Sequence, residues 1–222
     1  MMEGRTTHAD HFVAIAGNIG VGKTRLTREI SRLLGWSPYF EPVDINPYLD
    51  DFYADMNRWS FHLQVYFLSK RFMMHKDLVD MGVPCIQDRS IYEDAEIFAR
   101  ILHSRGQMDE RDYENYAALY RVMTHYLRPP DLIIGLWASV DTLVHRISLR
   151  GRSCEKTISR DYLEELNDAY SSWFGRAGGI TQFMLVDTDR IDLLREEEMH
   201  GLVEEVARRV GYQLELPLER SS

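Results

Sequence analysis

The sequence predicts an α/β fold, in which a parallel sheet is covered by helices on both faces. Short apolar runs alternate with longer helical segments along the 222 residues, and this alternation is typical of parallel sheets. A glycine-rich phosphate-binding motif lies between the first apolar run and the first helical segment. The length suits one domain, and no internal repeat or low-complexity linker divides the chain.

The alternation places the elements in order along the chain. The predicted strands cover residues 12–16, 39–41, 83–87, 132–137 and 182–186. The predicted helices cover residues 23–34, 57–81, 92–104, 109–126, 140–149, 160–174 and 196–210. Gly35 and Gly82 follow the first two helices, where glycine often ends a helix. Residues 1–11 are expected to form a flexible tail.

The phosphate-binding motif matches the pattern G-x-x-x-x-G-K-[ST]. Its residues are Gly17, Asn18, Ile19, Gly20, Val21, Gly22, Lys23 and Thr24. The glycines let backbone N–H groups turn toward phosphate oxygens, and the N-terminus of the following helix adds its dipole. Lys23 supplies a point charge and Thr24 a hydroxyl for Mg²⁺. A glycine-rich turn without a ligand is the alternative, and the strand and helix beside the motif argue against it.

Composition excludes several kinds of partner. The chain carries 35 Asp and Glu against 26 Lys and Arg, which argues against a general nucleic-acid or anionic-membrane surface. Cys85 and Cys154 lie far apart and predict neither a disulfide framework nor a metal site, so a reducing cytoplasmic setting is expected. The first ten residues hold no secretory signal, and no apolar run approaches the length of a membrane span.

Charged residues follow two of the predicted strands, at the edge where parallel sheets bind ligands. Glu41 ends the second strand and could take a proton from an acceptor hydroxyl, or could be a surface acid. Asp88 and Arg89 end the third strand. The acid could hold Mg²⁺ and the arginine could neutralise charge on a transferring phosphoryl group. The alternative is a local salt bridge, with Ser90 capping the next helix.

Arginines cluster at the end of the helix predicted for residues 140–149. Arg146 and Arg150 are four residues apart and share one helix face, and Arg152 follows the turn at Gly151. In an acidic protein this cluster suggests an anion clamp that closes over ATP. A solvated basic helix end is the alternative.

The long helix predicted for residues 57–81 carries polar residues in an apolar setting. Gln64 and Arg71 project from one face, two turns apart. Their neighbours are mostly apolar and include Trp59, Phe61, Leu63, Phe67 and Phe72. A glutamine amide suits the edge of a nucleobase, and a buried Arg71 needs a carboxylate, for which Asp94 is a candidate. A solvated stripe and an ordinary aromatic core are the alternatives.

Taken together, these residues resemble the deoxyribonucleoside kinase family. The resemblance extends from about residue 12 to residue 210, and its most specific stretches are residues 46–53, 58–64 and 88–94. Within the family, the sequence resembles bacterial deoxyadenosine/deoxycytidine and deoxyguanosine kinases in particular. The resemblance implies a single domain over residues 1–222 with a three-layer P-loop kinase fold. It further implies a five-stranded parallel sheet of order 2-3-1-4-5, an arginine-rich lid at about residues 146–159, and a homodimer through the long helices.

The resemblance also implies roles around the acceptor hydroxyl and the base. Glu41 matches the base that activates the 5′-hydroxyl, and Arg89 matches the arginine that holds this carboxylate and the reacting centre. Asp88 matches the acid near Mg²⁺, while Tyr53 and Glu155 match the pair that binds the 3′-hydroxyl. The base pocket is matched by Gln64, Arg71, Asp94, Phe98 and Trp59.

On the donor side, the resemblance assigns Arg146, Arg150 and Arg152 to the lid. The segment from Asp187 matches the one that meets the adenine of ATP. Thymidine-preferring members lack the arginine–aspartate pair, so Arg71 and Asp94 favour cytosine or a purine over thymine. The choice among deoxyadenosine, deoxycytidine and deoxyguanosine stays open, as does the choice between ATP and GTP as donor.

The sequence therefore predicts an ATP- and Mg²⁺-dependent kinase that phosphorylates the 5′-hydroxyl of a deoxyribonucleoside in nucleotide salvage. One alternative is a nucleoside monophosphate kinase such as thymidylate kinase, which would need a second basic site for the acceptor phosphate. Another is a non-catalytic, nucleotide-dependent switch. GTPase-type switches carry an N-K-x-D motif, which this sequence lacks.

Overall fold

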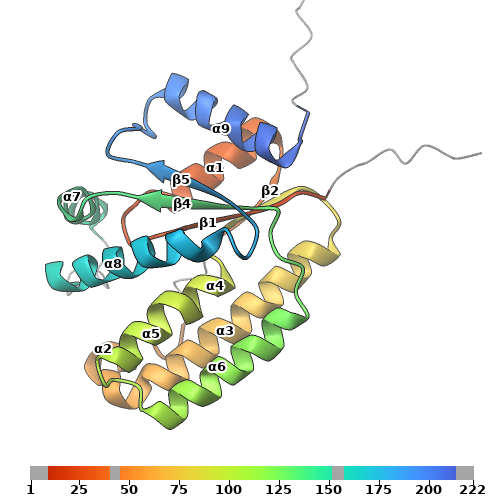
Figure 1. Cartoon of the computed structure of the whole chain (residues 1–222). Helices are drawn as coiled ribbons and strands as arrows, with labels where there is room; N and C mark the ends of the chain where they lie inside the picture. The colour runs from red at the N-terminus through yellow and green to blue at the C-terminus, as the bar shows by residue number, and fades with distance from the viewer. Residues whose placement is uncertain (1–9, 41–45, 152–157, 214–222) are drawn as a thin grey trace, which may run out of the picture.

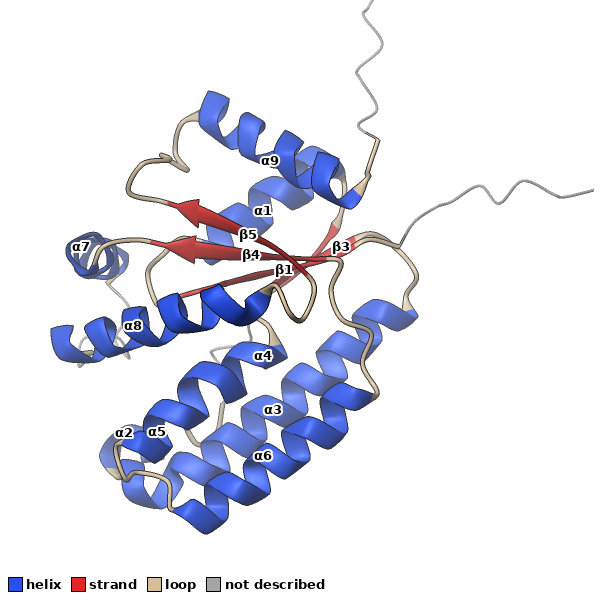
Figure 2. Ribbon diagram, viewed as in Figure 1, coloured by secondary structure: helices blue, strands red, loops and turns tan. Residues whose placement is uncertain are grey.

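A five-stranded parallel sheet forms the centre of the molecule (Figures 1 and 2). The computed structural model describes residues 10–40, 46–151 and 158–213. The strand order is β2-β3-β1-β4-β5, which confirms the order implied by the resemblance. The strands are β1 (Phe12–Gly17), β2 (Ser37–Tyr39), β3 (Cys85–Asp88), β4 (Leu132–Trp137) and β5 (Gln182–Asp187).

The central strand β1 positions the phosphate-binding motif. All six of its residues are buried, as expected for a parallel strand covered on both faces. It pairs with β3 so that Ile15 lies opposite Asp88, and with β4 so that Gly17 lies opposite Leu136. The phosphate-binding loop and the end of β3 therefore meet at one edge of the sheet.

Helices cover both faces of the sheet and add a further layer. Figure 1 shows α1 (Lys23–Leu34) and α9 (Glu196–Val210) on one face and α8 (Arg160–Ala177) on the other. Two long helices, α3 (Met56–Asp80) and α6 (Glu110–His125), lie side by side farther from the sheet. The described part of the chain also forms α2 (Leu49–Ala54), α4 (Ile91–Glu93), the π-helix η2 (Asp94–Ala99), α5 (Arg100–Ser104) and α7 (Val140–Arg150). None of the helices described is both long and apolar enough to cross a bilayer.

Several elements differ from the sequence-based prediction. Strand β2 begins at Ser37 and ends at Tyr39, whereas residues 39–41 were predicted. The helix predicted for residues 92–104 is divided into α4, η2 and α5. Helix α2 was not predicted, although Asp50 and Asp51 in its first turn favour a helix N-terminus. The predicted helix-ending glycines are confirmed, because Gly35 and Gly82 both have positive φ angles.

The start of β3 holds a cysteine in the protein core. Cys85 is buried and its thiol is free. It packs in a small apolar cluster with Phe12 of β1 and Leu78 of α3. Burial raises the pKa of this thiol to about 12. Cys85 therefore serves as a small apolar residue of the core.

Candidate active site

A cavity of about 370 Å³ extends from the phosphate-binding loop to the long helix α3. It lies at the edge of the sheet where the strands end, the usual place for a ligand in this class of fold. Many of the residues singled out from the sequence line it. They are Ile19, Gly20, Lys23, Thr24, Tyr53, Gln64, Arg71, Asp88, Arg89, Asp94, Phe98 and Arg150. The structure thus brings the phosphate motif and the polar residues of α3 into one cavity.

The phosphate-binding loop is held in shape by its own lysine. Lys23 is buried, and its Nζ donates to the carbonyl oxygens of Gly17 at 2.8 Å and Asn18 at 3.0 Å. Gly17 has φ +148°, and a Cβ atom there would lie 2.6 Å from the Leu136 carbonyl oxygen. Only glycine fits such a position without a shift of the backbone. The two hydrogen bonds of Lys23 therefore point its positive charge into the curve of the loop.

Thr24 and Asp88 form a paired oxygen site next to this loop. The Thr24 hydroxyl donates to Asp88 Oδ2 at 2.5 Å. Asp88 Oδ1 is buried and has no hydrogen-bond partner within the part of the chain that the structure describes. Hydroxyl and carboxylate oxygens are the ligands that Mg²⁺ prefers, so these residues fit the predicted metal role.

Arg89 adopts a backbone conformation that is unusual for a side chain of its size. Its φ is +70°, and its N–H donates to the Ile15 carbonyl at 2.9 Å. The guanidinium lies over the Phe98 ring, 4.7 Å from the ring centroid, and Nη1 donates to the Tyr170 hydroxyl at 3.0 Å. Left-handed conformations of non-glycine residues carry strain and are concentrated at functional sites. The packing around Arg89 holds it in this conformation.

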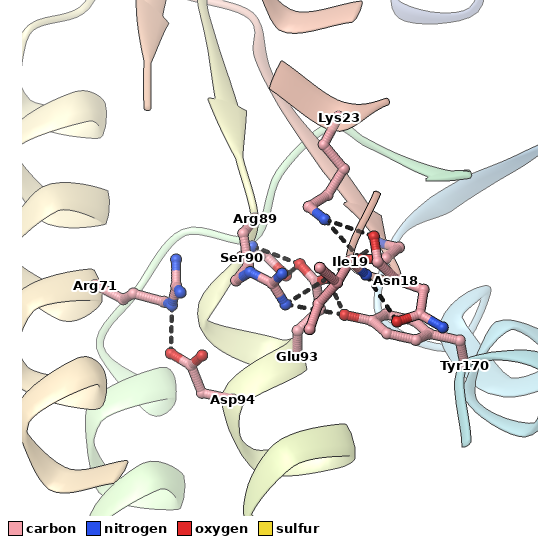
Figure 3. A network of polar contacts seen from close by, with 10 residues as sticks. Asn18, Ile19, Lys23, Arg71, Arg89, Ser90, Glu93, Asp94 and Tyr170 are labelled. Carbon is pink, nitrogen blue, oxygen red and sulfur yellow. Dashed lines mark hydrogen bonds and ion pairs between the residues drawn. The ribbon is translucent and has the colours of Figure 1, made fainter. Parts of the chain in front are cut away.

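The opposite end of the cavity contains a buried ion pair, shown in Figure 3. Arg71 Nε lies 2.5 Å from Asp94 Oδ2, and the two side chains are 4% and 3% exposed. The predicted pairing of Arg71 with Asp94 is confirmed. Gln64 is also buried and lines the same cavity, and its Oε1 has no hydrogen-bond partner among the described residues. The cavity therefore contains both an amide oxygen and a buried pair of opposite charges.

A buried tyrosine on α6 lies behind this pair. Burial and the Asp94 carboxylate raise the pKa of Tyr116 well above its ordinary value. The Tyr116 hydroxyl has no hydrogen-bond partner in the described part of the chain. Tyr116 does not line the cavity.

The aromatic wall of the cavity differs in part from the prediction. Phe98 and Tyr53 line the cavity as expected, but Trp59 does not. The Trp59 ring packs against Tyr48 and His62, with centroid distances of 5.8 and 5.2 Å. Its position on α3 turns it away from the face that carries Gln64 and Arg71.

The comparison with known proteins decides the family. Residues 13–210 match the model of the family described as deoxynucleoside kinase. The chain belongs to the deoxynucleoside kinase family. It is 40% identical over 199 residues to the deoxyadenosine/deoxycytidine kinase of Bacillus subtilis, a match that covers 88% of this chain and 91% of that one. It is 41% identical over 163 residues to the deoxyguanosine kinase of the same organism, covering 72% and 76% of the two chains.

Solved structures of deoxynucleoside kinases share the fold. The deoxyadenosine kinase of M. mycoides with the products dCMP and dCDP aligns with a TM-score of 0.78 and 30% sequence identity. The alignment covers 89% of this chain and 99% of that chain. The same kinase with bound dATP also aligns with a TM-score of 0.78 and 30% identity, covering 88% and 98% of the chains. These matches confirm the resemblance seen in the sequence.

The arginine cluster of this kinase family member begins inside a helix. Residues 146–150 belong to α7, and Gly151 caps this helix with φ +66°, so the first part of the segment assigned to the lid, about residues 146–159, is helical. Arg146 donates to the Val21 carbonyl at 3.2 Å and to the Thr188 hydroxyl and carbonyl at 2.8 and 2.9 Å. It therefore ties α7 to the phosphate loop and to the segment after β5, while Arg150 lines the cavity.

Three of the predicted site residues are not described by the structure, and a fourth lies away from the cavity. Glu41, Arg152 and Glu155 lie outside the described residues. Asp187 ends β5 but does not line the cavity. Its carboxylate accepts from the Asp189 N–H at 3.0 Å and pairs with Arg190 at 3.2 Å.

Sequence reasoning missed several residues of the site. Tyr162 of α8 lines the cavity, and burial raises the pKa of its hydroxyl to about 12. Glu93 and Tyr170 contact Arg89 and each other. Glu93 had a readable signal, because Ser90 and Glu93 match a capping box and Ser90 does cap α4. Tyr162 and Tyr170 had no such signal in the sequence, because the spacing of residues along α8 does not show which face of the helix meets the cavity.

Proposed function

We propose that the chain transfers the γ-phosphoryl group of ATP to the 5′-hydroxyl of deoxyadenosine, deoxycytidine or deoxyguanosine. One observation carries this function: a single cavity joins Lys23 and Thr24 of the phosphate loop to the buried Arg71–Asp94 pair. The acceptor end suits an uncharged sugar and a base, because its arginine already contacts a carboxylate. A monophosphate kinase would need a further basic site there. The relatives named above favour neither that alternative nor a non-catalytic switch.

The phosphoryl-transfer roles fall on the end of the cavity near the sheet. Glu41 takes the proton of the 5′-hydroxyl, while Lys23 and the loop amides stabilise the phosphate charge. Arg89 stabilises the charge that develops on the transferring group. Thr24 and Asp88 would hold Mg²⁺, which supplies positive charge to the β- and γ-phosphate oxygens when bound.

Substrate recognition falls on the remaining residues. The base contacts the Gln64 amide, the Arg71–Asp94 pair and the ring of Phe98, which all line the cavity. Tyr53 and Glu155 bind the 3′-hydroxyl. Arg146 acts through the loop it holds, Arg150 and Arg152 face the phosphates, and the segment from Asp187 meets the adenine of ATP. We further propose that the enzyme works in nucleotide salvage in the cytoplasm.

A phosphoryl-transfer assay tests this function directly. The four natural deoxynucleosides are offered in turn, each with ATP and with GTP as donor, and the monophosphate formed is measured. We expect deoxyadenosine, deoxycytidine or deoxyguanosine to yield about tenfold more monophosphate than thymidine. This factor corresponds to roughly one hydrogen bond to a charged group. Phosphorylation of deoxynucleoside monophosphates instead of deoxynucleosides would overturn the proposal.

Glu41→Gln is expected to lower kcat by about a hundredfold, because general-base catalysis contributes at least this much. The Kd for ATP should change little, since the proposed role concerns the acceptor. Steady-state kinetics and ATP titration separate the two effects. A variant that keeps more than about a tenth of the wild-type kcat would rule out Glu41 as the base.

We propose a homodimer that forms through α3 and α6. On α6 and just after it, Leu119, Val122 and Tyr126 form an exposed apolar stripe, with Val122 59% and Tyr126 77% exposed. Their spacing of three and four residues puts them on one face of the helix. Exposed apolar stripes of this kind mark protein interfaces.

Val122→Asp is expected to weaken the dimer by about thirtyfold or more, the effect of a central interface residue. Sedimentation equilibrium at several concentrations measures this change. Val144→Asp on α7 is the control, because Val144 is also an exposed valine but lies outside the two long helices. A wild-type protein that sediments as a monomer at micromolar concentration would contradict the proposal.

A further inference from the structure

A buried carboxylate links the phosphate-binding loop to the segment after β3. Glu93 is 0% exposed and lies at the end of α4. Its Oε1 accepts from the Ser90 N–H at 2.7 Å, and its Oε2 accepts from the Gly17 N–H at 3.0 Å. Gly17 is the first residue of the phosphate motif and Ser90 directly follows Arg89. One carboxylate thus connects the phosphate-binding loop to the segment that carries Arg89.

The Tyr170 hydroxyl extends this connection to the Arg89 side chain. It donates to Glu93 Oε2 at 2.7 Å and accepts from Arg89 Nη1 at 3.0 Å, as Figure 3 shows. Arg89 Nη1 itself lies 3.7 Å from Glu93 Oε2, beyond the length of a good hydrogen bond. The hydroxyl therefore bridges the guanidinium and the carboxylate. Tyr170 is buried on α8, so a third element fixes the position of the bridge.

The geometry requires a carboxylate at residue 93. Both of its oxygens face donors, since backbone N–H groups approach Oε1 and Oε2 from different segments. A glutamine amide has the same shape but would turn its NH₂ group toward one of these donors. A buried carboxylate also needs an opposite charge, which the Arg89 guanidinium provides.

We infer that Glu93 is a positioning residue for Arg89, with the Tyr170 hydroxyl as the link between them. Glu93 sets the distance between the guanidinium and the phosphate-binding loop because it binds the first residue of that loop. This inference rests on the proposed function, in which Arg89 stabilises the transferring phosphoryl group. Neither Glu93 nor Tyr170 touches the substrate in this role.

The test is a double-mutant cycle on the full-length enzyme. Tyr170→Phe removes only the bridging hydroxyl and keeps the ring in the core, so it should fold. We expect it to lower kcat about tenfold, the effect of one lost hydrogen bond to a charged group, with KM for both substrates changed less than about twofold. Glu93→Gln should also lower kcat, and by a larger factor than Tyr170→Phe. In an Arg89→Lys background, Tyr170→Phe should change kcat less than about twofold, because its partner is already gone.

Tyr116→Phe is the matched control. It also removes one buried tyrosine hydroxyl from a helix, but this hydroxyl has no partner in the described part of the chain. We expect its kcat to equal that of the wild type. Thermal melting of all variants checks that the fold is intact.

Two results would overturn the inference, and they can be told apart. In the first result, Arg89→Lys has a low kcat, but Tyr170→Phe either leaves kcat unchanged or lowers it equally in the wild-type and Arg89→Lys backgrounds. This result would overturn the positioning role alone. An Arg89→Lys variant with unchanged kcat would overturn the proposed role of Arg89, and the positioning role with it.

Discussion

Replacing Lys23 by methionine is expected to lower kcat by about a thousandfold, the upper range for one lost charge-stabilising donor. Lys23 is buried, and its ammonium group is fixed by the Gly17 and Asn18 carbonyls. Methionine keeps the apolar stem but brings no charge to the phosphate oxygens. Because negative charge on these oxygens develops toward the transition state, the loss should appear in kcat more than in the Kd for ATP.

Single-turnover kinetics and calorimetric ATP titration measure the two quantities for Lys23→Met. Lys76→Met is the matched control, because Lys76 is an exposed lysine of α3 that pairs with Asp80 on the surface. The control should keep the wild-type kcat. If Lys23→Met kept more than about a tenth of the activity, the phosphate loop would have a purpose other than phosphoryl transfer.

Breaking the Arg71–Asp94 pair on one side is expected to destabilise the fold by about 3–5 kcal/mol. Both side chains are almost fully buried, so solvent screens the pair very little. Asp94→Ala leaves the Arg71 guanidinium in the core without this carboxylate. Arg71→Met leaves the Asp94 carboxylate in the core without this guanidinium. The double variant should be milder than either single variant, since it removes both charges. It should also gain activity on thymidine, because the pocket then accepts the thymine methyl group.

Urea unfolding of the two single variants and the double variant measures the stability change. Kinetics on thymidine and deoxyadenosine measure the change in specificity. Glu96→Ala with Arg100→Met is the control, because these residues form a partly exposed pair on the same segment, with side chains 32% and 48% exposed. An exposed pair should contribute less than about 1 kcal/mol. Unchanged kcat/KM for thymidine in the double variant would show that Arg71 and Asp94 do not set specificity.

The sheet was predicted well because its strands leave clear signals in the sequence. The strand at residues 132–137 is short, apolar and bounded by turns, and the structure reproduces it. The three residues of β2 and the six of α2 are too few to show a period. The π-helix η2 reads as an ordinary helix, because its hydrogen-bond pattern depends on tertiary contacts that the sequence does not display.

The site was predictable where position along a strand or the cost of burial constrained it. Asp88 was placed beside the phosphate loop by its strand end, and Asp94 was chosen because a buried Arg71 needs a counter-charge. The contacts of Arg146 and the departure of Trp59 depend on how α7 and α3 are rotated. Helical spacing gives the relative direction of two side chains but not the face that meets the cavity.

The buried cysteine of β3 limits where a thiol-reactive dye can attach to the folded protein. A thiol with a pKa of about 12 is almost entirely protonated at neutral pH, and Cys85 is also shielded by the core. The chain contains one other cysteine, Cys154, which follows Gly151 in the segment assigned to the lid from the sequence. A cysteine-reactive dye that the native enzyme takes up is therefore attached at Cys154.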